Sequence, residues 1–441
     1  MTDQPSFERL LADRMEAERG STRLPEAFYD DFRLQARRMP QRPRWLAYLK
    51  EPPMRISSSL AVGSPTVRVA AIVVATLLIA AMVAGAGLAG SRLLAADGPI
   101  VVDHSGGGTV TTITEAVAMA QDGDEIVVKP GTYDESITIT KDITLRGEDR
   151  DSVIILPTGD APTYDDFWWG PETFSLLLMD SDAVISDLTF GRSSHDVVAK
   201  GGAPSIHDIT MNEDNLVVYA GSSATVKDST LRGTWIHVDE QSPVTIENSS
   251  FRAIVANTDN TALVGGPVTI RNNTTQGIAF NGSAVVEGNT VVAGMESMFD
   301  DFYGSGIDVQ AGEGWLIKDN VVRGFSRGTA IDVPSGALGT VSGNTLANNQ
   351  IAIKTASDSV FEGNVVTGGE TGIVTGLGTP QLTGNTITGV SGQGLALDGQ
   401  PTLSGNSSCE NGENLWVADN ATPVIDDSNQ ICEDAPDAAV E

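Results

Sequence analysis

Leu382-Thr-Gly-Asn-Thr-Ile387 is one copy of a short phrase that recurs between Ile185 and Ser408. Each copy has an apolar residue, a variable residue and then Asp, Gly or Asn, followed by short polar and apolar residues. Most copies lie about 20 residues apart, and they begin at Ile185, Ile206, Val226, Ile246, Ile270, Val286, Ile317, Val341, Phe361, Leu382 and Leu403. A period near 20 predicts a solenoid, in which each turn buries its apolar side against its neighbours.

The repeats hold short β-branched runs separated by Gly, Asn and Asp, and no run has the 3.6-residue spacing of an amphipathic helix. Leucine does not dominate them, which argues against leucine-rich repeats. The pattern therefore predicts an all-β, parallel β-helix, with strands about 4.8 Å apart along the stack. Seven asparagines at equivalent positions predict an internal hydrogen-bonded ladder: Asn273, Asn289, Asn320, Asn344, Asn364, Asn385 and Asn406.

This phrasing resembles the right-handed parallel β-helix repeats of pectin-lyase-like proteins over roughly residues 98–430. The resemblance implies the fold, but not one function, because enzymes, adhesins and binding proteins share it. Gly131-Thr-Tyr-Asp-Glu135 is similar to the opening motif of pectin methylesterases. The later Gln-Asp and Gly-Arg-Pro-Trp elements of those enzymes are absent, so we do not infer esterase activity.

A capping helix is expected before the first full coil. Thr112-Ile-Thr-Glu115 fits a capping box, in which Thr112 accepts from the Glu115 amide and the Glu115 carboxylate reaches back. The helix is expected to continue to Ala120 and to cover the open end of the first coil, because a solenoid otherwise exposes its core there.

The first 92 residues differ from the repeats. Residues 1–68 hold 12 Lys+Arg and 9 Asp+Glu, whereas residues 91–441 hold 15 and 49. Between them, residues 69–90 contain Thr76 as their one polar side chain and would span about 33 Å as a helix. We predict a single transmembrane helix with its flanks at residues 66–92. The basic residues that precede it place the N-terminus in the cytoplasm and the β-helix outside the cell, at a bacterial surface.

The predicted domains are a partly helical cytoplasmic head (residues 1–65), the span, an extracellular β-helix (93–430) and an acidic C-terminal tail (431–441). The head is too short to bury a robust core. It either docks on a cytoplasmic protein partner or the membrane surface, or serves only to set the topology. The two cysteines, Cys409 and Cys432, lie on the outer side, where a disulfide is favoured and an unbonded pair is the alternative.

Two insertions interrupt the repeats and are candidate ligand-binding segments. Residues 157–174 include Tyr164, Trp168 and Trp169, and residues 295–303 include Phe299, Asp300, Asp301 and Tyr303. Aromatic rings beside carboxylates suit glycan binding, since rings pack on sugar faces while carboxylates accept hydroxyl hydrogen bonds. Two alternatives stay open: a Ca²⁺ site in the acidic clusters, and aromatic side chains that simply cover coil edges.

The catalytic candidates are Asp308 and Asp332, each in an Ile-Asp-Val segment. Strand alternation directs both outward, and adjacent coils would bring them to about 5 Å, with Lys354 at the same place on the next coil. Such a pair can act as general acid and nucleophile on a glycosidic bond. The alternative is a solvated charge ladder. The same alternation exposes His237 and Asp239 on an earlier coil.

Several functions are excluded. The four histidines lack metal-ligand spacing, so no zinc site is predicted, and no phosphate-binding loop is present. The acidic balance of residues 91–441 argues against nucleic acid and dense polyanions. We predict a non-catalytic protein that binds a glycan or cell-envelope polymer, or that has a structural role at the surface, without an organic cofactor. The alternatives are a polysaccharide-active glycoside hydrolase and a single-span receptor that signals through its head.

Overall fold

The computed structural model describes residues 98–157, 163–164, 172–191, 195–212, 215–219, 221–239, 242–256, 267–294 and 304–434. The predicted head and transmembrane span lie outside these ranges. Among the described residues, no helix is both long and apolar enough to cross a bilayer. The chain divides into two compact units, Met1–Ala95 and Ala96–Glu441. All the elements described below belong to the second unit.

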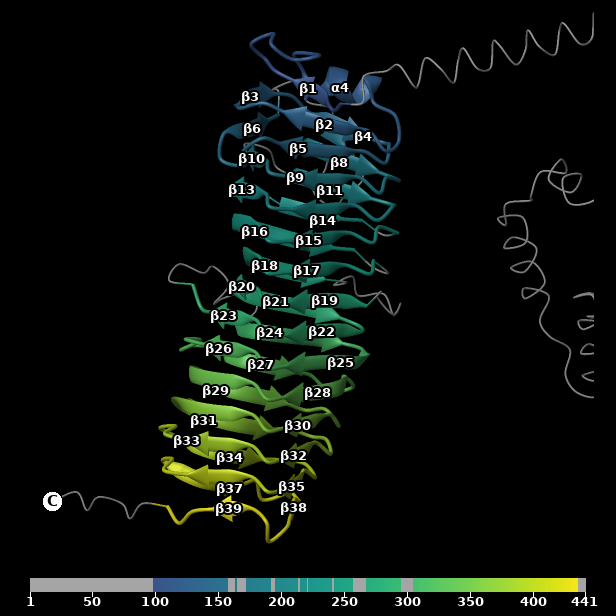
Figure 1. The fold of residues 1–441 in the computed structure, drawn as a ribbon. Coiled ribbons are helices and arrows are strands. Elements are labelled where there is room, and N and C mark those ends of the chain that lie inside the picture. The colour runs from purple at the N-terminus through teal and green to yellow at the C-terminus, as the bar shows by residue number, and fades with distance from the viewer. Residues whose placement is uncertain are drawn as a thin grey trace, which may run out of the picture. The chain divides into compact units, whose positions relative to one another are not determined.

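Parallel strands wind through this unit in successive coils that stack along one axis (Figure 1). The first sheet has 15 described strands, in the order β1 (Ile100–Val102), β2 (Glu125–Val128), β5 (Thr144–Gly147), β9 (Val184–Ser186), β12 (Ser205–His207), β15 (Thr225–Lys227), β17 (Thr245–Glu247), β19 (Val268–Arg271), β22 (Ala284–Glu287), β25 (Glu313–Lys318), β28 (Leu338–Ser342), β30 (Val360–Glu362), β32 (Gln381–Thr383), β35 (Thr402–Ser404) and β38 (Val424–Ile425).

The second sheet has 24 described strands: β3 (Gly131–Asp134), β4 (Ile137–Ile139), β6 (Val153–Leu156), β7 (Thr163–Tyr164), β8 (Glu172–Met179), β10 (Thr189–Gly191), β11 (His195–Lys200), β13 (Thr210–Asn212), β14 (Asn215–Val218), β16 (Thr230–Val238), β18 (Ser250–Ala256), β20 (Thr274–Thr275), β21 (Gly277–Asn281), β23 (Thr290–Val292), β24 (Ser305–Ala311), β26 (Val321–Arg323), β27 (Thr329–Val333), β29 (Thr345–Thr355), β31 (Val365–Thr375), β33 (Thr386–Thr388), β34 (Gln393–Leu397), β36 (Ser407–Cys409), β37 (Glu413–Val417) and β39 (Gln430–Ile431). The first part of β29 pairs with β26 and its last part with β27, so this sheet bends around a corner and has a β26 side and a β27 side.

The core is one apolar column inside the coils. Equivalent residues of the repeated phrase are register partners, as Ile246 is with Ile270 and Ile317 with Val341. Their side chains are fully buried and belong to a single cluster that runs from Val102 to Leu403. The predicted parallel β-helix is confirmed, with about 13 turns.

The predicted asparagine ladder is present at the turn between the first sheet and the β26 side. Asn320 Nδ2 donates to Asn344 Oδ1 at 2.9 Å, and Asn344 Nδ2 donates to Asn364 Oδ1 at 2.9 Å. The same bond links every step from Asn273 to Asn406, and the ladder continues to Asn429, which the repeats did not predict. The residue before each of the seven predicted ladder positions is left-handed, with φ of 53° at Asp319 and 64° at Gly343, which explains why the phrase carries Asp, Asn or Gly there.

The predicted capping helix is α4 (Ile113–Met119), with Thr112 as its N-cap. The Thr112 hydroxyl accepts from the Glu115 amide at 3.2 Å. The second half of the expected capping box is different, because the carboxylate that meets the helix N-terminus belongs to Glu135. It accepts from the amides of Ile113 and Thr114 at 2.8 and 2.7 Å. Glu135 of the esterase-like motif thus has a structural role, since it ties β3 to the helix that caps the first coil.

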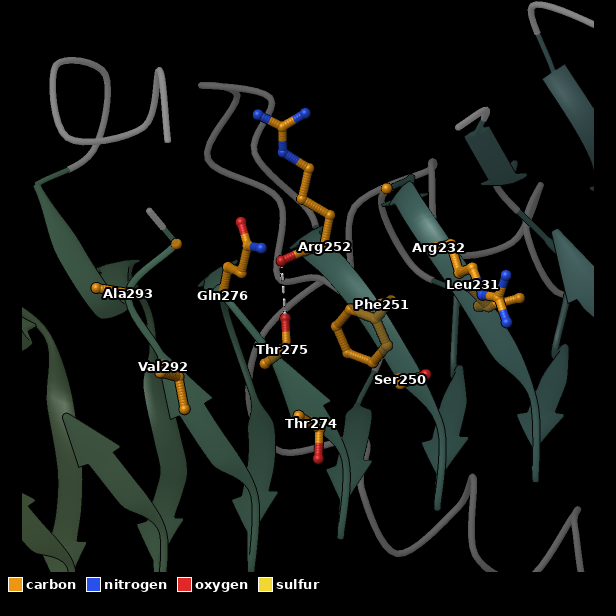
Figure 2. Close-up of a pocket in the computed structure, with 12 residues that line it drawn as sticks. Leu231, Arg232, Ser250, Phe251, Arg252, Thr274, Thr275, Gln276, Val292 and Ala293 are labelled. Carbon is orange, nitrogen blue, oxygen red and sulfur yellow. Dashed lines mark hydrogen bonds between the residues drawn. The ribbon is translucent and has the colours of Figure 1, made fainter. Parts of the chain in front are cut away.

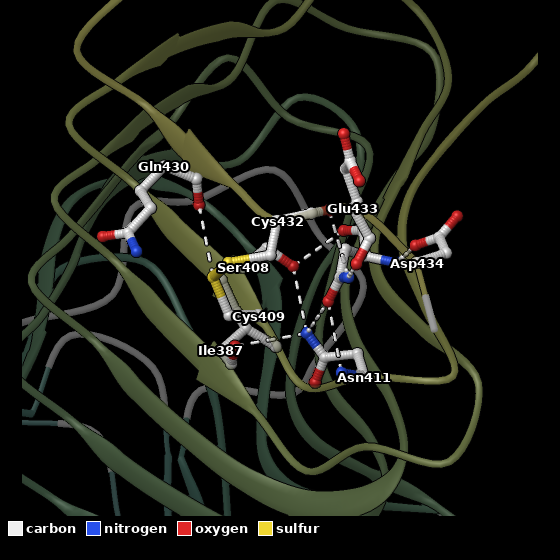
Figure 3. The surroundings of a disulfide bond; sticks show 9 residues. Ile387, Ser408, Cys409, Asn411, Gln430, Cys432, Glu433 and Asp434 are labelled. Atoms are coloured by element: carbon white, nitrogen blue, oxygen red, sulfur yellow. Dashed lines mark hydrogen bonds between the residues drawn. A yellow bond between two sulfur atoms is a disulfide. The ribbon is translucent and has the colours of Figure 1, made fainter. Parts of the chain in front are cut away.

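A disulfide joins Cys409 to Cys432, with their Cα atoms 5.0 Å apart (Figure 3). It connects β36 to the residue that directly follows β39, and β39 is the next strand along the stack. The bond therefore fastens the last described coil to the one before it.

Candidate functional site

Asp308 and Asp332 lie side by side on the outer surface of the β27 side. They are register partners across β24 and β27, and Asp332 is in turn the partner of Lys354 on β29. The residues that flank Asp308 in sequence, Ile307 and Val309, are fully buried, so strand alternation directs the carboxylate outward. The three charged side chains thus form a column on three consecutive coils.

A pocket of about 530 Å³ opens beside this column. Its walls come from β24, β27, β29, β31 and the turns that follow them, and its lining residues are Asp308, Val309, Gln310, Asp332, Val333, Pro334, Ser335, Lys354, Thr355, Ala356, Val374 and Gly376. Carboxylate, amide, hydroxyl and ammonium groups therefore share one hollow with apolar atoms, as in sites for small polar ligands.

The two carboxylates have different electrostatic surroundings. Burial raises the pKa of Asp308 to about 6, and the nearby charge of Asp332 adds to the shift. A hydrogen bond from Gln310 and the charge of Lys354 oppose it. Asp332, in contrast, accepts a hydrogen bond from Lys354 Nζ at 3.1 Å. One carboxylate therefore has an ion-pair partner, while its neighbour protonates near neutral pH.

The predicted aromatic insertions fall mostly outside the described residues. Tyr164 lies in β7, which pairs antiparallel with β8, and its side chain is not described. The other candidates in the insertions lie outside the described ranges: Trp168, Trp169, Phe299, Asp300, Asp301 and Tyr303. Their contact with a glycan, with Ca²⁺ or with coil edges stays a prediction. Within the described ranges, no three His, Cys, Asp or Glu side chains are grouped to hold a metal ion.

His237 and Asp239, predicted to be exposed, are half-buried, and both take part in further interactions. The His237 ring stacks on Trp235, with centroids 5.9 Å apart and planes at 7°. Arg252 on the next strand places its Cζ atom 6.0 Å from the centre of the Trp235 ring. An aromatic and cationic cluster therefore lies several coils before the Asp308 column.

A second pocket, of about 520 Å³, lies elsewhere on the second sheet (Figure 2), and the sequence did not predict it. It lies over β16, β18, β20 and β23, and its polar lining includes Arg232, Ser250, Arg252, Thr274 and Gln276. The available signal was an arginine directly after the apolar residue that closes two successive phrases, as in Leu231-Arg232 and Phe251-Arg252.

A sequence profile described as "Right handed beta helix region" matches residues 277–431. Similar solved structures include the catalytic unit of the thermostable GH87 α-1,3-glucanase from Streptomyces thermodiastaticus strain HF3-3, with 14% identity and a TM-score of 0.45 over 72% of this chain and 64% of that chain. This chain therefore spans less than two thirds of the glucanase unit.

Two further structures are similar at comparable identity. PfbA, a surface adhesin of Streptococcus pneumoniae, has 13% identity and a TM-score of 0.41 over 64% of this chain and 86% of that chain. The mannuronan C-5 epimerase AlgE6 A-module of Azotobacter vinelandii has 13% identity and a TM-score of 0.36 over 73% and 93%. No curated protein matches the sequence. The profile match and the strand topology together describe a right-handed parallel β-helix solenoid.

Proposed function

We propose that this chain is a non-catalytic glycan-binding protein whose binding site is the pocket beside Asp308, Asp332 and Lys354. The observation that carries the proposal is the placement of these three charged groups on consecutive coils, at the edge of a 530 Å³ pocket. Carboxylates accept hydrogen bonds from sugar hydroxyls, whereas the Lys354 ammonium donates to them.

The shape of the site suits an extended ligand. Polar groups recur from coil to coil, at steps of about 4.8 Å along the stack, so a linear glycan lying along the axis meets one after another. Pro334 adds apolar surface for sugar C–H groups. The net charge of −31 disfavours a dense polyanion, so a neutral or cationic glycan is the expected ligand.

We also propose that the predicted transmembrane span at residues 66–92 anchors the β-helix at the outer side of the membrane. The disulfide between Cys409 and Cys432 supports it, because such bonds persist in oxidising compartments. Residues 1–65 then face the cytoplasm, where they are available to a protein partner. Deletion of residues 1–92 should move the chain from the membrane fraction to the soluble fraction. A full-length chain that is already soluble would contradict the anchor.

A glycan array tests the binding site. Purified full-length chain should bind one group of neutral or amino-sugar glycans, and the double variant Asp332→Asn, Lys354→Met should lose that binding. Lys318→Met is a matched control, because Lys318 is also an ion-paired surface lysine but lies on the first sheet. Equal binding by the double variant and the wild type would place the ligand elsewhere.

The unequal carboxylates favour glycoside hydrolysis as a second candidate function. A carboxyl whose pKa is near 6 can donate a proton, and a carboxylate on the adjacent strand can act as nucleophile or base. A reducing-end assay on any array ligand distinguishes the two functions. Hydrolysis that Asp308→Asn abolishes would establish the enzyme, whereas binding without release of reducing ends supports the binder.

A further inference from the structure

The column that contains Asp332 and Lys354 continues toward the C-terminal end of the stack. Lys354 on β29 is the register partner of Val374 on β31. Val374 is the partner of Ala396 on β34, and Ala396 is the partner of Trp416 on β37 (Figure 1). Three coil steps of about 4.8 Å place Trp416 about 14 Å from Lys354 along the stack. The charged pocket and a tryptophan therefore belong to one line of equivalent strand positions.

Trp416 faces away from the core on the side of its coil. Its register partner Ala396 lies between Leu395 and Leu397, which are fully buried, so alternation directs the Ala396 position outward. Leu415, which precedes Trp416, packs against the core cluster. Trp416 itself is 44% exposed. Its indole ring is therefore presented to solvent on the same face as the charged pocket.

Two other exposed apolar residues near this end have a different cause. Val417 and Ile425 are the register partners of Leu397 and Leu403, whose side chains are fully buried in the core. They continue the inward columns and are exposed because the described stack ends beside them. The exposure of Trp416 does not have this origin, because its position faces sideways on every coil of the column.

Trp416 also differs from the other tryptophans of the described residues. Trp315 is 2% exposed, and its indole nitrogen donates to the Gly312 carbonyl oxygen at 3.2 Å. Trp235 stacks on His237. Among the described residues, the Trp416 ring stacks on no other ring and faces no cation. Its face is therefore available to a ligand.

The surface between the pocket and Trp416 is apolar, with polar groups at one edge. Val374 is half-buried and lines the pocket, and Ala396 follows it on the next coil. On the turns that follow β34 and β37, Asp398 Oδ1 accepts a hydrogen bond from Asn420 Nδ2 at 3.2 Å. A pyranose with equatorial hydroxyls has the complementary arrangement, because its faces carry C–H groups and its edges carry hydroxyls.

We infer that Trp416 is a further subsite of the glycan site, an aromatic platform for a linear neutral glycan whose hydroxyls are equatorial, such as a β-1,4-linked glucose chain. The chain would lie along the stack, with hydroxyls of one sugar at Asp332 and Lys354 and the C–H face of a later sugar on the indole ring. About four sugars would cover the three coil steps from Lys354 to Trp416. The inference rests on the proposed function, because it takes the charged pocket as the other end of the ligand.

Calorimetric titration of the full-length chain with β-1,4-linked glucose oligosaccharides of different lengths tests this subsite. The hexasaccharide should bind at least about tenfold more tightly than the disaccharide, because only the longer chain reaches both the pocket and the indole ring. An α-1,4-linked glucose hexasaccharide, which coils, should bind no better than the disaccharide. Trp416→Ala should weaken the β-1,4-linked hexasaccharide by about tenfold and leave the disaccharide unchanged, whereas Trp416→Phe should retain most of the affinity.

Val424→Ala is the matched control. Val424 is 62% exposed at the same end of the stack, but it lies on β38 of the first sheet. The inference is overturned if Val424→Ala weakens the hexasaccharide as much as Trp416→Ala does. It is also overturned if Trp416→Ala has no effect, or if it weakens the disaccharide and the hexasaccharide equally. A wild-type dimer in sedimentation that Trp416→Ala dissociates would assign the ring to a second copy of the chain, which overturns the subsite as well.

The same titration separates this subsite from the pocket. The double variant Asp332→Asn, Lys354→Met should weaken oligosaccharides of every length. If that variant binds like the wild type while Trp416→Ala loses the hexasaccharide, the pocket is contradicted and the Trp416 platform is supported. If no glucose oligosaccharide binds, the Trp416 inference is overturned, and the glycan array still tests the pocket.

Discussion

Asp308 and Asp332 are register partners on adjacent strands, yet only Asp332 has a described ion pair, with Lys354 at 3.1 Å. Burial raises the pKa of Asp308 to about 6, and the nearby charge of Asp332 adds to the shift. The column therefore contains one carboxylate that is ion-paired with the Lys354 ammonium and one carboxylate that changes charge near neutral pH. This difference has measurable consequences for stability and for ligand binding.

Asp308 should lower the stability of the folded chain at neutral pH. Its folded pKa of about 6 lies above the ordinary value of 3.8, so its stabilising contribution is complete below about pH 4 and is lost as the pH rises through 6. A shift of about two units corresponds to about 3 kcal/mol, and partial exposure reduces this. Asp308→Asn should therefore raise the free energy of unfolding by about 1–2 kcal/mol at pH 7 and have little effect at pH 4, as measured by urea unfolding.

Asp358→Asn is a control for this experiment. Hydrogen bonds from the Thr379 amide and hydroxyl lower the pKa of Asp358, so its stabilising contribution is present above pH 4 and is lost as the pH falls. The variant should not gain stability at pH 7. Identical pH profiles for the two variants would contradict the assignment of opposite shifts.

Lys354 and Asp332 should shift the titration of Asp308 in opposite directions. Lys354 lowers the pKa of Asp308 and Asp332 raises it. Lys354→Met should therefore move the midpoint above 6, and Asp332→Asn should move it toward 4. Carboxyl ¹³C chemical shifts followed against pH measure both midpoints. A midpoint that stays in place in both variants would show that burial alone sets it.

The interior of the asparagine ladder should be far less tolerant than its end. Asn344 is fully buried, and its Oδ1 accepts from both the amide and the Nδ2 of Asn320 at 2.9 Å. Asn344→Ala leaves two buried donors without a partner, which costs about 2–5 kcal/mol. Asn429 has the same role toward Asn406 but is partly exposed, so water can replace it. Asn429→Ala should cost about 1 kcal/mol, and equal losses in thermal unfolding would contradict this gradient.

Removal of the disulfide should loosen only the end of the stack. The bond closes a loop with a sequence separation of 23, for which a stabilisation of about 2–4 kcal/mol is typical. Because each coil contacts mainly its neighbours, the loss should remain local. In a Cys409→Ser, Cys432→Ser variant, amide hydrogen exchange should accelerate at β38 and β39 and remain unchanged at β24 and β27. Faster exchange along the whole stack would show that the terminal coil controls the rest.

The fold was predictable because the repeats express it locally. The left-handed position before Asn320 needs Asp, Asn or Gly, and the buried turn is stabilised by the Asn itself, so both appear in the sequence at each predicted turn of the ladder from Asn273 to Asn406. The pairing of Asp308 with Asp332 follows from the same repeat, because buried isoleucines fix the alternation of both strands.

Other features depend on contacts that no local pattern expresses. Glu135 caps α4 from the turn that follows β3, so Glu115 was the wrong partner to expect. The second pocket, which Arg232 lines, lies where the register between β16 and β18 shifts, between Leu231 and Trp235. Gly233 takes a left-handed φ of 67° there. Strict alternation does not hold through such a bulge. The depth at which Asp308 lies, which sets its pKa, is likewise a property of the assembled coils.

The most direct test of the proposed binding site is the rate at which an amine-reactive reagent labels Lys354, with and without the glycan that the array identifies. Lys354 has a side-chain exposure of 54% and lines the pocket, while Lys318 has 44% and lies on the first sheet as an internal control. The proposed site predicts that saturating glycan slows labelling of Lys354 several-fold and leaves Lys318 unchanged. Unchanged labelling at Lys354, or an equal decrease at both lysines, would contradict it.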